Sequence, residues 1–326
     1  MATYYPLIPR EPPKRLSLVI PIYNEYAVLP LLLERLTELL AKLPCDTEVI
    51  LVNDGSSDRS LDLLLAKAKE DKRFKVIALA RNFGHQIAAT AGLDRASGDA
   101  VVLMDADLQD PPELINQLLA EYCAGYDIVY AKRIRREGET QMKRLTAWAF
   151  YRLMRLLVAK NLPLDVGDYR LMSRESLSTM LKLGERHRFL RGMACWIGFA
   201  TTYVEFVRPA RAAGETKYPL HKMLLLACNA AISFSALPLR LTFLLGGLFT
   251  AVGLVYGAYA LFRVMTGLYV VPGWTSSIVL TCLTSGAIMS CLGVLGEYIA
   301  RLYDEIKARP LYTVYRMTNF THPEES

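Results

Sequence analysis

The sequence predicts an α/β protein built on a parallel, doubly wound sheet and followed by two long apolar segments. Over the first 130 residues, β-rich runs alternate with amphipathic helical patterns, and polar loops follow three of the runs. Further along the chain, two long stretches contain no charged residue. Ligands of doubly wound sheets bind beyond the carboxyl ends of the strands, so the three polar loops indicate one shared crevice.

The individual elements follow from periodicity and from helix-start signals. Ser57 and Asp58 suit a helix N-cap, and the pair Pro111–Pro112 suits the first turn of another helix. The predicted strands are Leu16–Ile22, Glu48–Asn53, Lys75–Leu79, Ala100–Met104 and Asp127–Ala131. The predicted helices are Val28–Lys42, Asp58–Glu70, His85–Ala96 and Pro112–Tyr122.

The two apolar segments predict transmembrane helices. Residues 241–262 and 264–296 carry no charge, and about 20 apolar residues span a bilayer. We expect spans at Leu241–Phe262 and Trp274–Ile299; a buried core helix is the alternative. Only Arg263 lies near one side of this pair, so both termini and the globular part should be cytoplasmic, in an inner or plasma membrane. The basic residues on the other side are Lys222, Arg240, Arg301, Lys307, Arg309 and Arg316.

These patterns give a domain organisation. We expect a cytosolic globular domain at 1–220, an interfacial amphipathic helix at 221–236, a transmembrane hairpin at 237–300 and a cytosolic tail at 301–326. Residues 143–160 form either a second interfacial helix or an ordinary helix packed on the domain.

Composition limits the compartment and the partners. Six cysteines without Cys-x-x-Cys spacing indicate reduced thiols. A net charge of +6 with basic residues beside the apolar segments favours an anionic membrane surface, and no nucleic-acid motif occurs.

The strongest chemical motif is the run from Asp105 to Asp110, which directly follows a predicted strand. Two carboxylates at that position are costly unless a positive group joins them. Oxygen ligands suit Mg²⁺ or Mn²⁺, which share their coordination shell with substrate phosphates. We therefore expect Asp107 to bind the metal directly and Asp105 to contact the metal or a ribose.

Two weaker loops lie at neighbouring strand ends. Asp54 can accept a hydrogen bond from a pyrimidine imide or can close an Asx-turn; Asp58 fits the capping role better, which would leave Asp54 free. Arg81 can meet a phosphate or ribose, or it can be an ordinary surface arginine. The residues expected to line the other side of the base are Pro21, Tyr23 and Glu25.

Together the motifs resemble family-2 glycosyltransferases with the GT-A fold. The matching segments are VIPIYNE, VNDGSSD, RNFGHQIAATAGLDRASGD, DADLQDPPELI, DVGDYRLMSRE and GETKYPLHKM. The resemblance covers nearly the whole chain and is closest to the bactoprenol glucosyltransferases of the polyisoprenyl-phosphate branch, which also includes dolichyl-phosphate mannose synthase. It implies that a nucleotide sugar, commonly UDP-glucose, donates its sugar to undecaprenyl phosphate with inversion.

The resemblance also implies residue roles. Asp54 would bind uracil, Asp105 and Asp107 the ribose and the metal–diphosphate, and Gln109 the donor sugar or the metal's surroundings. Asp168 matches the position proposed as the base. A phosphate acceptor is largely dianionic at neutral pH and needs little base help, so we expect Asp168 to orient Arg170, a sugar hydroxyl or the metal; a structural loop cap is the alternative. The residues expected at the acceptor or donor phosphate are Lys132, Arg133, Arg170, Arg211 and Lys217.

Alternatives stay open. A processive polysaccharide synthase is disfavoured because no Gln-x-x-Arg-Trp motif occurs, and a catalytically lapsed membrane scaffold is disfavoured by the intact acidic residues. Gly253 and Gly257 share a helix face, which permits close contact either within the hairpin or in a homo-oligomer. We expect the charged segment 132–141 to be an irregular loop that orders when donor or lipid binds.

Overall fold

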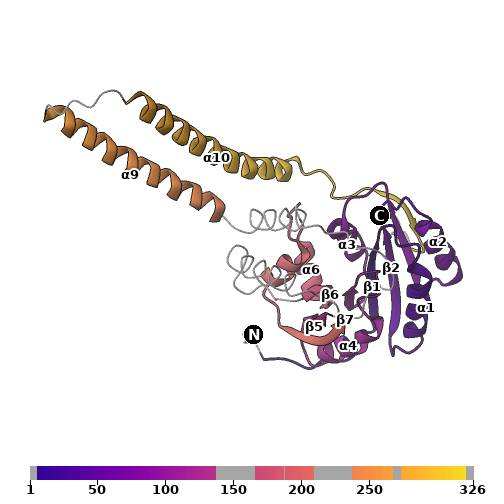
Figure 1. Cartoon of the computed structure of the whole chain (residues 1–326). Helices are drawn as coiled ribbons and strands as arrows, with labels where there is room; N and C mark the ends of the chain where they lie inside the picture. Colours follow the sequence, from indigo (N-terminus) through magenta and orange to yellow (C-terminus); the bar gives the residue numbers. More distant parts are fainter. Residues whose placement is uncertain (1–5, 137–165, 187, 209–236, 267–272, 321–326) are drawn as a thin grey trace. The chain divides into compact units, whose positions relative to one another are not determined.

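The computed structural model describes residues 6–136, 166–186, 188–208, 237–266 and 273–320. They divide into two compact units, one built around a sheet and one made of two long helices (Figure 1). The helices predicted at 143–160 and 221–236 lie outside the described residues.

The first unit is an eight-stranded sheet in the order β7-β5-β6-β4-β1-β2-β3-β8. Four neighbouring pairs are parallel, and antiparallel β6 separates β4 from β5. The predicted α/β, mostly parallel sheet is therefore confirmed. The strands are β1 (Arg15–Ile22), β2 (Asp46–Asn53), β3 (Phe74–Leu79), β4 (Ala100–Leu103), β5 (Ile128–Arg136), β6 (Val166–Ser173), β7 (Thr201–Arg208) and β8 (Val314–Thr318).

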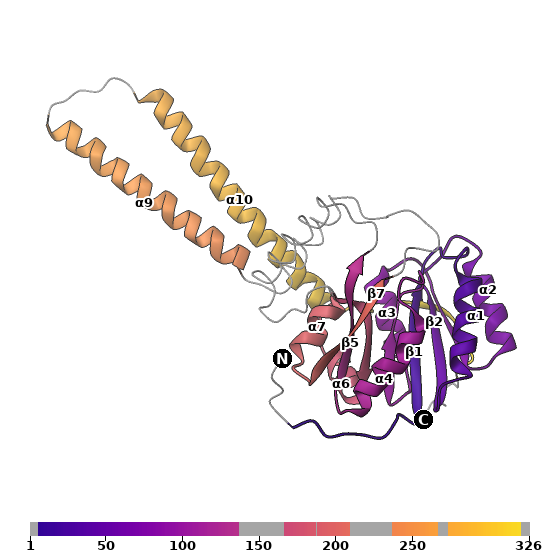
Figure 2. The same cartoon turned by 60° about the horizontal axis from the view of Figure 1, so that its bottom comes forward.

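Helices cover both faces of this sheet, as a doubly wound fold requires (Figure 2). Apolar residues of α1, α2 and α4 pack on one face, and those of α3, α6 and α7 pack on the other. The helices of this unit are α1 (Leu29–Leu40), α2 (Ser60–Glu70), α3 (His85–Leu93), the 3₁₀ turn η1 (Pro112–Leu114), α4 (Ile115–Cys123), α6 (Arg174–Leu181) and α7 (Leu190–Trp196).

All five predicted strands and all four predicted helices are present, with shifted ends. The largest shift is in β5, which continues to Arg136. The prediction of an irregular loop over 132–141 is therefore wrong for residues 132–136. Pairing with β7 up to Arg136 supplies the backbone hydrogen bonds that the charged side chains do not predict, whereas pairing with β6 ends at Lys132. Residues 137–141 lie outside the described residues.

The segment after the second apolar stretch is not a free tail. Residues up to Lys307 belong to α10, and β8 pairs antiparallel with β3. Asn319 adopts a left-handed conformation (φ 64°) and its amide donates to the carbonyls of Ala68 and Phe74 at 2.6 and 2.8 Å. The C-terminal segment thus covers an edge that β3 would otherwise expose.

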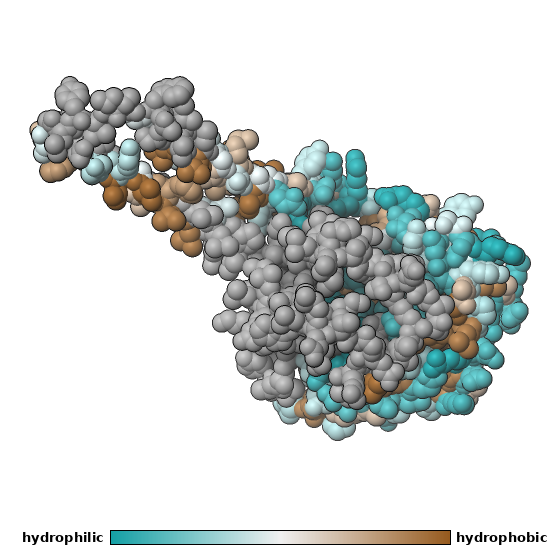
Figure 3. Space-filling view, viewed as in Figure 1, coloured by the Kyte–Doolittle hydropathy of each residue, from teal (hydrophilic) through white to brown (hydrophobic). Residues whose placement is uncertain are grey.

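The second unit consists of α9 (Leu237–Met265) and α10 (Trp274–Lys307). Within the described residues, Leu283–Lys307 alone is long and apolar enough to cross a membrane, and a shorter apolar stretch occupies Gly246–Tyr256. Two helices are present as expected, but two complete spans are not established. Figure 3 shows apolar side chains along the described parts of both helices.

A buried polar network ties three strands together. The Glu48 carboxylate accepts hydrogen bonds from the Ser17 hydroxyl (2.5 Å), from the Ser97 amide (2.7 Å) and from the Lys75 ammonium (2.6 Å). Burial alone would raise the pKa of Glu48, but these donors outweigh it and lower that pKa. Glu48 therefore stays ionised inside the sheet and joins β1, β2 and β3.

We expect Glu48→Ala to lower the free energy of unfolding by about 3 kcal/mol, because it leaves a partly buried ammonium unpaired. Since the folded pKa lies below the unfolded value near 4.5, this contribution is fully present above that pH and is lost as pH falls through the folded pKa. The measurement is the free energy of unfolding in urea for the full-length protein in detergent, from pH 3 to pH 7 in steps of about one unit. The exposed Glu34→Ala is the control, and equal losses in the two variants would contradict the prediction.

Candidate active site

The site begins where β4 ends, with Asp105 two residues beyond the strand. Its side chain is 27% exposed, and its Oδ1 accepts no hydrogen bond although it lies 3.4 Å from His85 Nε2. Asp105 Oδ1 is therefore buried without a hydrogen bond and has the His85 imidazole as its neighbouring positive group.

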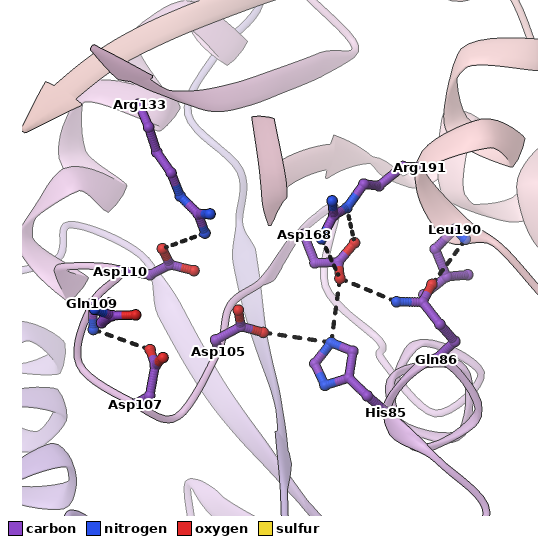
Figure 4. Close-up of polar contacts among 10 residues, drawn as sticks. All are labelled: His85, Gln86, Asp105, Asp107, Gln109, Asp110, Arg133, Asp168, Leu190 and Arg191. Atoms are coloured by element: carbon purple, nitrogen blue, oxygen red, sulfur yellow. Dashed lines mark hydrogen bonds and ion pairs between the residues drawn. The ribbon is translucent and has the colours of Figure 1, made fainter. Parts of the chain in front are cut away.

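Asp168 of β6 forms the centre of a hydrogen-bonded cluster (Figure 4). Its side chain is only 4% exposed. Arg191 donates through Nε (2.9 Å) and Nη2 (3.2 Å), Gln86 donates at 3.1 Å, and His85 Nε2 lies 3.3 Å away. Because His85 and Gln86 begin α3 and Arg191 belongs to α7, one carboxylate ties two helices to the strand.

The charges in this cluster perturb one another. Partial burial would lower the pKa of His85, but Asp168 and Asp105 outweigh it and raise the pKa to about 9. Burial would raise the pKa of Asp168, but Arg191 and His85 hold it well below the usual range. For Asp105, burial together with repulsion from Asp168 and Asp107 outweighs His85, and the pKa is raised. Asp105 thus has less compensating positive charge than Asp168, which receives it from both Arg191 and His85.

Asp107, Gln109 and Asp110 lie on the loop that follows β4. The Asp107 carboxylate accepts the backbone N–H of Gln109 at 3.1 Å, and Leu108 between them has a left-handed φ of 58°. The fully buried Asp110 forms an ion pair with Arg133 of β5 at 3.4 Å. This loop lies beside the Asp168 cluster in Figure 4, so the structure brings Asp105, Asp107 and Asp168 together.

Asp54 is not free, contrary to our expectation. Its carboxylate accepts the backbone N–H groups of Phe83 (2.8 Å) and Gly84 (2.9 Å). Gly55 (φ 63°) allows the two loops to approach this closely, because a Cβ there would lie 2.4 Å from the carbonyl carbon of Arg81. A carboxylate has about four acceptor positions, so contact with a base stays a prediction.

Other residues predicted to bind the nucleotide lie at or near the same strand ends. Pro21 is buried at the end of β1, Glu25 follows it, and Tyr23 is 43% exposed. Arg81 is exposed and lies over the Phe83 ring. Arg211 and Lys217 lie outside the described residues.

The basic residues of β5 and β6 differ from expectation. Lys132 pairs with Glu205 at 2.7 Å and stays 38% exposed. Arg170 is 0% exposed and pairs in register with Leu103, and its guanidinium has no hydrogen-bond partner among the described residues. The Asp168 carboxylate is therefore hydrogen-bonded to Arg191 and not to Arg170. A phosphate contact by Arg170 stays a prediction.

The residues at this edge fit a divalent cation that is shared with a diphosphate. Among the described residues, no group of three or more His, Cys, Asp or Glu side chains could hold a metal alone. Mg²⁺ sites commonly use one or two carboxylates plus substrate phosphates. The carboxylate of Asp105, whose Oδ1 accepts no hydrogen bond, and the neighbouring carboxylate of Asp107 match that pattern.

Sequence reasoning missed His85, Gln86 and Arg191 as site residues. The first two begin a helix just after Gly84, at a strand end, which is a signal that could have been used. Arg191 follows Asp168 by 23 residues and comes from a short helix that no pattern predicted.

Comparison with known proteins gives the family. Residues 17–181 match the glycosyl transferase family 2 model, and residues 237–302 match the GtrB C-terminal hairpin. The chain belongs to glycosyl transferase family 2. The α/β sheet unit is thus that of a glycosyltransferase of this family.

Relatives within the family align over nearly their full lengths. An uncharacterized glycosyltransferase, YkcC of Bacillus subtilis, is 46% identical over 92% of this chain and 93% of its own. The prophage-derived bactoprenol glucosyl transferase of Shigella flexneri is 38% identical over 92% and 97%. The glucosyl-3-phosphoglycerate synthase of Mycobacterium tuberculosis, solved with Mn²⁺ and UDP-glucose, has a TM-score of 0.47 at 20% identity over 68% and 78%, which is too distant to bear on the site.

We expect Asp168→Asn to lower the free energy of unfolding by about 3 kcal/mol, because an amide cannot accept hydrogen bonds on both of its terminal atoms and leaves Arg191 uncompensated. Asp107→Asn, on the more open loop, should cost less than about 1 kcal/mol. Urea unfolding of both full-length variants in detergent checks this, and similar losses would show that Asp168 does not support the fold.

Proposed function

We propose that this glycosyltransferase transfers glucose from UDP-glucose to undecaprenyl phosphate at the cytoplasmic face of the membrane, with inversion and with a divalent cation. The observation that carries the proposal is the pair of carboxylates Asp105 and Asp107 at the exit of β4, of which Asp105 Oδ1 accepts no hydrogen bond. The identity of 38% over 92% of the chain to a bactoprenol glucosyl transferase supports glucose as the transferred sugar and a bactoprenol lipid as the acceptor.

The proposed reaction exchanges one bond at the anomeric carbon. An oxygen of the lipid phosphate forms the new bond from the face opposite the diphosphate, and the bond to UDP breaks, which inverts the configuration. A bound cation would neutralise the charge that develops on the leaving diphosphate. Asp168, ionised and saturated by donors, holds His85 and Arg191 in place and is not needed as a proton acceptor.

We also propose that α9 and α10 anchor the chain in the membrane as a hairpin with both ends cytoplasmic. Large apolar side chains are exposed along both helices, which is costly in water. Examples are Leu254 (70%), Val255 (71%) and Met289 (69%). The match to the GtrB hairpin over 237–302 supports the same arrangement.

We expect Asp107→Asn to reduce glucosyl transfer roughly 100-fold or more, because a neutral amide balances neither the cation nor the charge of the transition state. The measurement is formation of radiolabelled glucosyl lipid from UDP-glucose and undecaprenyl phosphate in membranes, together with Mn²⁺-dependent UDP binding. Asp62→Asn, on the exposed surface of α2, is the control.

The same assay separates the alternatives. A panel of UDP-, GDP- and dTDP-sugars would reveal a different donor, and polymeric product would identify a processive synthase. If no sugar–lipid product forms in a single turnover, the remaining interpretation is a membrane-tethered scaffold that binds the nucleotide sugar without catalysis. Undiminished transfer by Asp107→Asn at saturating metal would overturn the metal assignment.

Arg211 and Lys217 are proposed to contact a phosphate directly. If so, replacing either with Ala should lower turnover of a short-chain, soluble prenyl phosphate by about ten-fold or more, because a charge-assisted hydrogen bond is lost. A residue that only meets lipid headgroups would weaken membrane association and leave this turnover unchanged. Full activity of both variants on the soluble acceptor would refute the assignment.

A further inference from the structure

Strand β5 is irregular where it passes the acidic loop. Its register with β6 shifts between Tyr130 and Lys132, and its register with β7 shifts between Arg133 and Arg135. Such bulges redirect side chains next to functional sites. Lys132 and Arg133 lie between the two irregularities, and the side chain of Arg133 is only 12% exposed.

The guanidinium of Arg133 lies between β6 and the acidic loop. Its Nη2 is 3.4 Å from Asp110 Oδ1. On the β6 side it lies against Gly167, where an added Cβ would come within 2.5 Å of Nη2 and 3.0 Å of Cζ. Any residue other than glycine at 167 would therefore displace the guanidinium.

The buried carboxylate of Asp110 requires a positive partner, and the loop that carries it is also attached to β6. The Asp110 side chain is 0% exposed, and an uncompensated buried carboxylate is strongly unfavourable. One residue further on, the Pro111 carbonyl accepts the Tyr169 hydroxyl at 2.9 Å. Gly167 and Tyr169 share one face of β6, so this face fixes the end of the loop that carries Asp107.

We propose that Arg133 is a positioning residue that holds the metal-binding loop through Asp110, and that Gly167 provides the space for its guanidinium. This inference rests on the proposed role of Asp107 at a metal–diphosphate. It replaces the earlier expectation that Arg133 binds a phosphate directly, since most of its side chain is enclosed by protein.

The test is a double-mutant cycle on the full-length protein in detergent. We expect Arg133→Ala and Gly167→Ala each to speed amide hydrogen exchange in a peptide covering 104–114. We also expect each variant to weaken binding of UDP with Mn²⁺ by about ten-fold. The double variant should match Arg133→Ala alone, because the added methyl group then has no guanidinium to displace. Gly184→Ala is the matched control, since a Cβ there meets nothing within 4 Å.

Several outcomes would overturn the proposal. Additive losses in the double variant would show that Gly167→Ala damages β6 itself, and unchanged loop exchange in Arg133→Ala would exclude the positioning role. A higher KM for soluble prenyl phosphate with unchanged exchange would identify Arg133 as a phosphate ligand. If the wild-type protein does not bind UDP with Mn²⁺, the proposed function fails, but the exchange measurements still test the link between Arg133 and the loop.

Discussion

The site depends on the burial of one carboxylate, that of Asp168. A carboxylate removed from water requires several donors, and Asp168 receives them from Arg191, Gln86 and His85. These donors come from the first residues of α3 and from α7, so satisfying this one charge also fixes how two helices meet β6. The same imidazole then lies 3.4 Å from Asp105 Oδ1, which links the buried cluster to the acidic residues that follow β4.

Strand β6 has different functions on its two faces. Asp168 points to the face covered by α3 and α7, whereas Gly167 and Tyr169 point to the face where the acidic loop passes. Because β6 runs antiparallel beside β4, it brings both sets of contacts to the end of β4. One strand thereby supports the Asp168 cluster on one face and the proposed metal loop on the other.

The sequence predicted the strand ends because polar loops after parallel strands necessarily share one edge of the sheet. The sequence did not predict the contacts that depend on residues far apart along the chain. Arg191 joins Asp168 through a seven-residue helix with no periodic signal, and Arg170 is buried because alternation along β6 places it beneath that helix. Asp54 was misjudged for a related reason: the capping argument considered only the next helix, whereas its partners Phe83 and Gly84 come from the following strand end.

The order of elements changes how the apolar hairpin should be understood. Since β8 belongs to the same sheet as β1–β7, the two long helices are an insertion between β7 and β8 and not a C-terminal appendage. The returning strand pairs with β3, and the Ala80 N–H donates to the Thr313 carbonyl at 2.9 Å. β3 leads into the Arg81–Gly84 loop, whose backbone N–H groups donate hydrogen bonds to the Asp54 carboxylate. The chain that leaves the hairpin therefore completes the sheet beside β3, the strand that leads into this loop, which its sequence alone does not indicate.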